Sequence, residues 1–309
     1  MNAGEQLDER KSTETKPRVA DPGMLSRRRR TGVWIALMAL LLVGSIAYAQ
    51  FRGRRGSRRG NGDFESNVSS PSWTNPKAFK HDVFTFARIE YDSDRGGWGS
   101  GRGWSTDYSD ADINLLFRLQ QITSMKVNDD PEGRHLRLTD PDLYKYPFIY
   151  IVEPGGLYLS DLEAERLRKH LLNGGFLMLD DFWGERAWEN MESQIKKAFP
   201  DREFADLPAN HPIFNGVFRL DKDKLQTPSV DLGMQSEYDG VTWERPDARE
   251  VHFRGLYDDK GRLMLLACHN TDNGDGWERE GLNEYFFREF SSKKNYPLAV
   301  NIVLYMMSH

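Results

Sequence analysis

The chain has 309 residues, of which 39% are hydrophobic and 12% aromatic, and this composition favours a globular protein over a disordered one. The formal net charge is −5, but residues 1–60 hold 13 of the 42 Lys and Arg and 5 of the 47 Asp and Glu, which leaves 29 basic and 42 acidic side chains in residues 61–309. The acidic body therefore lacks the basic excess that binding to nucleic acid requires.

The first predicted element is an uncharged apolar segment at residues 33–49, which closely follows four arginines at residues 27–30. Its 17 residues are near the lower limit for a membrane-spanning helix and also fit a signal peptide, for which Ala47 and Ala49 before Gln50 form an acceptable cleavage site. The upstream arginines favour an N-terminus inside the cell. We expect the domain to lie outside the cytoplasm, either anchored to the membrane or periplasmic or secreted after cleavage behind Ala49.

These features divide the chain into four parts. Residues 1–32 are expected to form a disordered basic tail and residues 33–51 the transmembrane or signal-anchor segment. Residues 52–81, rich in Gly, Arg and Ser, are expected to form a flexible linker before a folded domain at residues 82–309.

The domain begins with a predicted strand at residues 83–91, a glycine-rich loop at residues 92–109 and a helix at residues 110–123, for which Ser109 or Asp110 is the cap. A second unit follows. Residues 147–152 are a continuous apolar run typical of a strand buried on both faces. Ser160 and Glu163 form a capping box for a helix that ends at residues 173–175.

Residues 176–179 are the next predicted strand, residues 180–184 its turn and residues 186–199 another helix. Residues 250–256 and 262–268 flank a turn and predict a hairpin, and residues 297–307 predict a final apolar helix. Strands that alternate with helices indicate an α/β fold with an open, mostly parallel sheet, mixed at one edge.

Residues 86–92, 104–112 and 117–124 together resemble the bacterial family called domain of unknown function 4159. Further similar segments lie at residues 174–181 (GGFLMLDD), 211–214, 269–272, 276–278 and 301–305, so the resemblance covers nearly all of residues 82–309. It implies a flavodoxin-like three-layer sandwich related to class I glutamine amidotransferases. It also implies a family whose members are often attached to a membrane and have no established activity.

Ligands of open parallel sheets bind outside the carboxyl ends of the strands. This rule selects polar residues that follow the predicted strands or lie beside them, and the ligand-binding candidates are Asp92, Asp107, Asp180, Asp181, His269, Asn270 and Asp272. Asp180 and Asp181 fit a divalent cation or a general base, but they equally fit a helix cap and a solvated side chain. We therefore assign no metal and no cofactor.

Amidotransferase chemistry needs a cysteine on the turn between a strand and a helix, backed by a histidine. The turn expected after Leu179 holds neither cysteine nor serine. The single cysteine, Cys268, excludes an internal disulfide, and it neighbours His269 on a strand, where successive side chains point to opposite faces. Cys268 is therefore interpreted as a buried structural residue, and the nucleophile of an amidotransferase is absent.

Two functions stay open. The first is a non-catalytic binding or scaffold module at the cell envelope, tethered to the membrane by its N-terminal segment and available to protein partners there. The alternative is a metal- or carboxylate-dependent hydrolase of a sugar or another envelope substrate, which rests on the carboxylates at the strand ends. The glycine-rich run at residues 96–103 matches neither a dinucleotide-binding nor a Walker pattern and indicates a loop.

Overall fold

The computed structural model describes residues 71–75, 82–93, 103–130 and 132–309. The predicted tail and membrane segment, most of the linker and nearly all of the glycine-rich run lie outside the described residues. No helix in the described part of the chain is long and apolar enough to cross a membrane.

The core of the domain is a seven-stranded sheet. In spatial order its strands are β3 (Arg134–Leu136), β1 (Ala87–Ile89), β4 (Phe148–Val152), β6 (Phe176–Phe182), β9 (Leu263–His269), β8 (His252–Tyr257) and β7 (Ala205–Asp206). Neighbours from β3 to β9 run parallel, whereas β8 is antiparallel to both β9 and β7. A separate antiparallel pair joins β2 (Asp92–Ser93) to β5 (Leu157–Tyr158). The sheet is therefore mostly parallel and mixed at one edge, as predicted.

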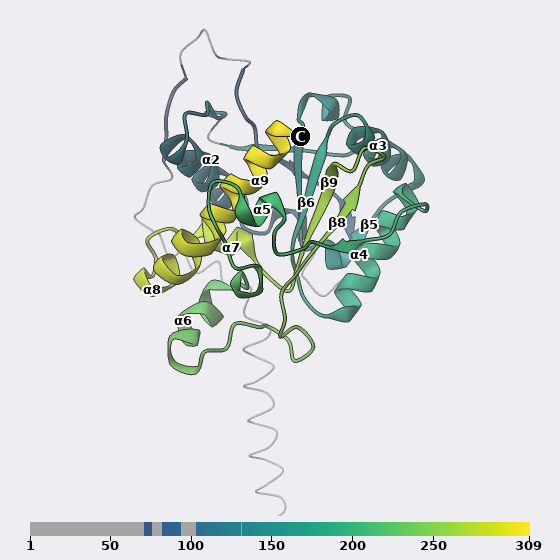
Figure 1. Ribbon diagram of the computed structural model, residues 1–309. Coiled ribbons are helices and arrows are strands. Elements are labelled where there is room, and N and C mark those ends of the chain that lie inside the picture. Colours follow the sequence, from purple (N-terminus) through teal and green to yellow (C-terminus); the bar gives the residue numbers. More distant parts are fainter. Residues whose placement is uncertain (1–70, 76–81, 94–102, 131) are drawn as a thin grey trace, which may run out of the picture. The chain divides into compact units, whose positions relative to one another are not determined.

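Helices cover both faces of this sheet (Figure 1). One face packs against α2 (Asp110–Ile122), α5 (Pro212–Asn215) and α9 (Tyr296–Ser308), and the other against α3 (Asp161–Leu172) and α4 (Glu185–Ala198). Successive residues of β4 alternate between the two cores, with Tyr150 in the first and Ile149 and Ile151 in the second. Both faces of β4 are buried, which explains its unbroken apolar sequence.

Shorter helices complete the described part of the domain. These are α6 (Val230–Asp239), α7 (Asn273–Glu278), α8 (Glu284–Phe286), a π-helix (Phe287–Asn295) and four 3₁₀ turns (Gly103–Ser105, Leu143–Lys145, Pro154–Gly156 and Lys222–Lys224). The sequence patterns predicted none of them, because each is too short to show a helical period. One of them, α7, carries part of the site described below.

Several predictions of local structure are confirmed. The helix at residues 110–123 is α2, the hairpin is formed by β8 and β9, and the C-terminal helix is α9. The capping box is present, because the Ser160 side chain accepts from the backbone N–H of Glu163 while the Glu163 carboxylate accepts from that of Ser160. Such a box satisfies two of the N–H groups that every helix start leaves unpaired.

Two boundaries are wrong. The strand predicted at residues 83–91 is regular only over Ala87–Ile89, with a separate bridge between Phe84 and Val127. The turn predicted at residues 180–184 does not start at residue 180, because β6 continues through Phe182, which pairs with His269 of β9. Asp180 therefore lies within the strand, buried by segments that are distant in sequence.

Candidate functional site

Asp180, on β6, is a buried carboxylate with four hydrogen-bond donors at the carboxyl edge of the sheet. Its side chain is fully buried and accepts hydrogen bonds from the Tyr150 hydroxyl (3.0 Å), from the backbone N–H of Asn273 (2.9 Å) and Gly274 (3.1 Å), and from the Asn273 amide (2.8 Å). Burial nevertheless raises the pKa of Asp180 to about 6, although these donors oppose the shift. Asp180 thus joins β6 to the start of α7.

Helix α7 brings three more acidic side chains to this edge. Asp272 caps the helix by accepting from the backbone N–H of Asp275 at 2.8 Å, and Asp275 itself accepts from the backbone N–H of Val230 at 3.0 Å. The carboxylates of Asp275 and Glu278 lie together with that of Asp107, the residue three positions before α2. One oxygen from each of these three side chains lies within 4.8 Å of the other two.

Asp107 has a carboxylate oxygen that lacks a hydrogen-bond donor. Its Oδ2 atom is buried and has no hydrogen-bond partner among the described residues. A side-chain carbon at Gly274 would lie 2.5 Å from that oxygen, so only glycine lets the carboxylate approach the start of α7. Because Asp180 also contacts Gly274, the two carboxylates converge on the same turn.

The carboxylates of this group repel one another. Burial comes first in raising the pKa of Asp107 well above its usual range, and the charges of Asp275, Glu278 and Asp181 add to the effect. Burial also raises the pKa of Asp181 and Asp272, again with neighbouring carboxylates as further causes. For Asp275, burial and then Glu278 raise the pKa to about 6. We call Asp107, Asp180, Asp181, Asp272, Asp275 and Glu278 the edge cluster.

Backbone strain gathers at the same edge. Among the described residues, the non-glycine residues with φ in the left-handed region are Asp107 (60°), Glu153 (50°), Asp181 (54°) and Asn270 (62°). Glu153 directly follows β4, Asp181 lies within β6 and Asn270 directly follows β9. Strained backbone of this kind costs roughly 1–3 kcal/mol per residue and persists where the surrounding structure imposes it, often at functional sites.

A buried ion pair holds one side of the edge cluster. Arg88 on β1 and Asp112 on α2 are both fully buried, and the guanidinium donates to both carboxylate oxygens. The same guanidinium donates to the backbone carbonyls of Trp104 (3.2 Å) and Thr106. Arg88 therefore fixes the segment that ends at Asp107.

The remaining candidates have structural partners. Asp92 is exposed and pairs with Arg137 at 3.1 Å. The ring of His269 is buried against Phe182, with Nε2 3.2 Å from the Gly184 carbonyl. The Asn270 side chain accepts from Gly184 N–H and donates to the Glu250 carbonyl. The structure thus brings Asp107, Asp180, Asp181 and Asp272 into one cluster, while Asp92, His269 and Asn270 bind to protein groups beside it. Cys268 is free and buried, as interpreted.

Sequence reasoning missed Asp275 and Glu278. Residues 272–278 contain two glycines and no apolar period, so they gave no helix signal. The spacing of Asp272 and Asp275 is that of an N-cap and its N3 residue, and this spacing was the available sign of a helix start.

The edge cluster predicts an unusual pH dependence of stability. A carboxyl group whose pKa is higher in the folded state than in the unfolded state favours folding while protonated, so its contribution is lost as pH rises through the folded pKa. His170, His211 and His269, whose pKa burial lowers to about 4, oppose this trend, because in the unfolded state they are still partly protonated near pH 6.5, and each adds a rise of about 0.4 kcal/mol between pH 6.5 and 8. Asp107→Asn keeps these histidines, so the free energy of unfolding of the native chain relative to that of Asp107→Asn, measured in chelator, is expected to fall from pH 6.5 to 8. An Asp107 carboxyl that stays protonated across this window contributes about 2 kcal/mol to this fall.

A family model described as a domain of unknown function (DUF4159) matches residues 85–307, which include every member of the edge cluster. No curated protein matches the chain.

Proposed function

The chain belongs to the family described as domain of unknown function 4159, and we propose that its domain binds a divalent cation in the edge cluster, with Asp107, Asp275 and Glu278 as protein ligands. The observation that carries this proposal is the buried, unpartnered Oδ2 of Asp107 beside two other carboxylates. An unpaired buried oxygen that faces like charges costs free energy, and a cation removes that cost. Carboxylate oxygens are the ligands that Mg²⁺ and Ca²⁺ prefer.

The topology supports a ligand at this position. Counted in chain order, the five parallel strands β3, β1, β4, β6 and β9 have the order 2-1-3-4-5, which supports a flavodoxin-like assignment. In such sheets ligands bind outside the carboxyl ends of the strands, where the edge cluster lies. We propose that the cation serves a binding module held at the cell envelope by the apolar segment at residues 33–49.

Titration of the full chain with MgCl₂ and CaCl₂ by calorimetry and thermal unfolding tests the cation site. At 100 times its dissociation constant, the cation is expected to add about 2.7 kcal/mol to the free energy of unfolding, a rise of roughly 5–10 °C in Tm. Asp107→Asn should abolish binding and, without cation, make the protein more stable by about 1 kcal/mol, because it removes a carboxyl group whose ionised form is disfavoured in the folded state.

The control is Glu237→Gln, a change at an exposed carboxylate of α6, which should keep the affinity of the native chain. Equal affinity of the native chain and Asp107→Asn would show that any cation binds elsewhere. Binding of neither ion at millimolar concentration would remove the proposal.

A hydrolase that uses the same cation is the second candidate, favoured by the strained residues at this edge. A bound cation lowers the pKa of a coordinated water, and Asp181, whose carboxylate accepts from the Trp183 indole at 3.0 Å, is the candidate base beside it. Asp181→Asn distinguishes the two functions. With p-nitrophenyl glycosides and saturating cation, an enzyme should lose turnover in this variant, whereas a binding module shows no turnover in either protein.

A further inference from the structure

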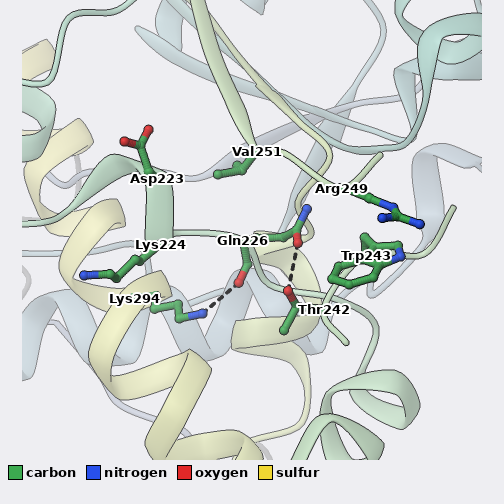
Figure 2. A pocket seen from close by; sticks show the side chains of 8 residues that line it. All are labelled: Asp223, Lys224, Gln226, Thr242, Trp243, Arg249, Val251 and Lys294. Carbon is green, nitrogen blue, oxygen red and sulfur yellow. Dashed lines mark hydrogen bonds between the residues drawn. The ribbon is translucent and has the colours of Figure 1, made fainter. Parts of the chain in front are cut away.

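A cavity of about 400 Å³ lies among residues that do not belong to the edge cluster (Figure 2). It is lined by two residues of the Lys222–Lys224 turn and by Gln226 after it, by residues 242–243, by Arg249 and Val251, and by Lys294 of the π-helix. Figure 2 shows Gln226 and Thr242 at its centre, Lys224 and Lys294 on one side, and Trp243 and Arg249 on the other. We call it the Trp243 cavity.

The charge of the Trp243 cavity is opposite to that of the body around it. Lys224, Arg249 and Lys294 line it together with one acidic residue, Asp223, whereas residues 61–309 as a whole hold 29 basic and 42 acidic side chains. A local excess of positive charge in an acidic protein favours an anionic ligand.

Two of these cations have no carboxylate partner. The Lys294 ammonium donates to the backbone carbonyl of Gln226 at 2.8 Å and, in the described part of the chain, forms no ion pair, which leaves N–H donors for a ligand. Burial lowers the pKa of Lys294 to about 8. The Arg249 guanidinium stacks 5.4 Å from the centroid of the Trp243 ring, and the residues described show no acceptor for its donors.

The centre of the cavity is fixed and offers an acceptor. The Gln226 amide donates to the carbonyls of Ala248 and Asn270, both at 3.0 Å, and its oxygen accepts from the Thr242 hydroxyl at 2.8 Å. Because Thr242 donates its proton to Gln226, its oxygen lone pairs are available to a hydroxyl group of a ligand. The half-buried Trp243 adds a flat apolar face of the kind on which sugar rings stack.

We propose that the Trp243 cavity binds an acidic sugar, with its carboxylate or phosphate group on Lys294, its ring against Trp243 and a hydroxyl group on Thr242. Cations that have no carboxylate partner bind the anionic group, and the indole and hydroxyl recognise the ring. This site is independent of the proposed cation site, because the two share no ligand residue.

Calorimetric titration of the full chain with glucuronate, glucose 6-phosphate, glucose and inorganic phosphate tests the site. At least one of the two acidic sugars is expected to bind at least about tenfold more tightly than glucose and than inorganic phosphate, and the tighter of the two identifies the anionic group. Lys294→Met should weaken binding of that sugar by about tenfold or more. The neighbouring Lys293→Met, which removes an exposed lysine paired with Glu289, is the matched control and should bind as the native chain does.

Arg249→Met, at an exposed side chain, keeps the test valid if Lys294→Met does not fold, and should also weaken binding. Asp107→Asn should leave sugar binding unchanged, which separates a failure here from a failure of the cation site. The proposal is wrong if glucose or phosphate alone binds as tightly as the acidic sugars, if Lys294→Met and Arg249→Met both retain native affinity, or if neither acidic sugar binds at about 10 mM.

Discussion

Replacing Arg88 by methionine is expected to lower the free energy of unfolding by about 3–5 kcal/mol, the loss typical of a buried ion pair that keeps only one partner. The guanidinium and the Asp112 carboxylate are both fully buried, so the variant leaves an uncompensated carboxylate in the interior. Two backbone carbonyls, those of Trp104 and Thr106, also lose their donor. Urea unfolding of the native chain and the variant measures the loss.

The double variant Arg88→Met with Asp112→Leu separates the effect of the unpaired Asp112 charge from the effect of the lost hydrogen bonds to Trp104 and Thr106. It removes the orphaned charge and should recover part of the stability, because buried ion pairs are often replaceable by apolar residues. It does not restore the donors that fix the segment before Asp107, so cation binding should stay weak. Lys145→Met, which breaks the exposed pair with Asp142, is the matched control and should change stability by less than about 1 kcal/mol. A similar small effect of Arg88→Met would contradict the buried pair.

Asp180→Ala is expected to lower the free energy of unfolding by at least about 3 kcal/mol. The change leaves four buried donors without an acceptor, namely the Tyr150 hydroxyl, the Asn273 amide and the backbone N–H groups of Asn273 and Gly274. Each buried donor left without an acceptor lowers the free energy of unfolding by about 1–3 kcal/mol. Part of this loss is offset, because the variant no longer buries a carboxylate.

Asp180→Asn is the conservative comparison. Its oxygen can replace Oδ2, which accepts three of the four hydrogen bonds, so the loss should be clearly smaller than for alanine. Equal losses for the two variants would show that the carboxylate's charge, and not its hydrogen bonds, joins β6 to α7. Thermal unfolding at pH 8, above the Asp180 pKa of about 6, gives the comparison with the native carboxylate ionised.

The parallel sheet was predictable because its strands and helices are patterned locally. The run from Phe148 to Val152 is buried on both faces, and its continuous apolar sequence indicates this. The capping box at Ser160 marks a helix start. The end of β6 was not predictable in this way, because acidic residues are rare in strands. Asp180, near the end of β6, accepts hydrogen bonds from Asn273 and Gly274, which no local pattern near residue 180 reveals.

The candidate site was predictable only in part, because the sequence shows where strands end but not which distant segments meet there. The rule for strand ends found Asp180 and Asp181, and neighbouring positions gave Asp107 and Asp272. Asp92 satisfies the same rule, yet in the fold it pairs with Arg137 at the surface. Asp275 and Glu278 lie on a helix of six residues, too short for periodicity to detect, and their proximity to Asp107 exists only in three dimensions.

The proposed cation ligands lie far apart in the sequence, since Asp107 precedes α2 near the start of the domain and Asp275 and Glu278 lie on α7 near its end. An ion held by both segments acts as a reversible crosslink that closes a long loop of chain. We expect this crosslink to form after the sheet has assembled from β1 through β4 and β6 to β9, so the ion should slow unfolding much more than it speeds folding. Resistance to proteases at cation concentrations above the dissociation constant would then be governed by the rate at which the domain releases its ion.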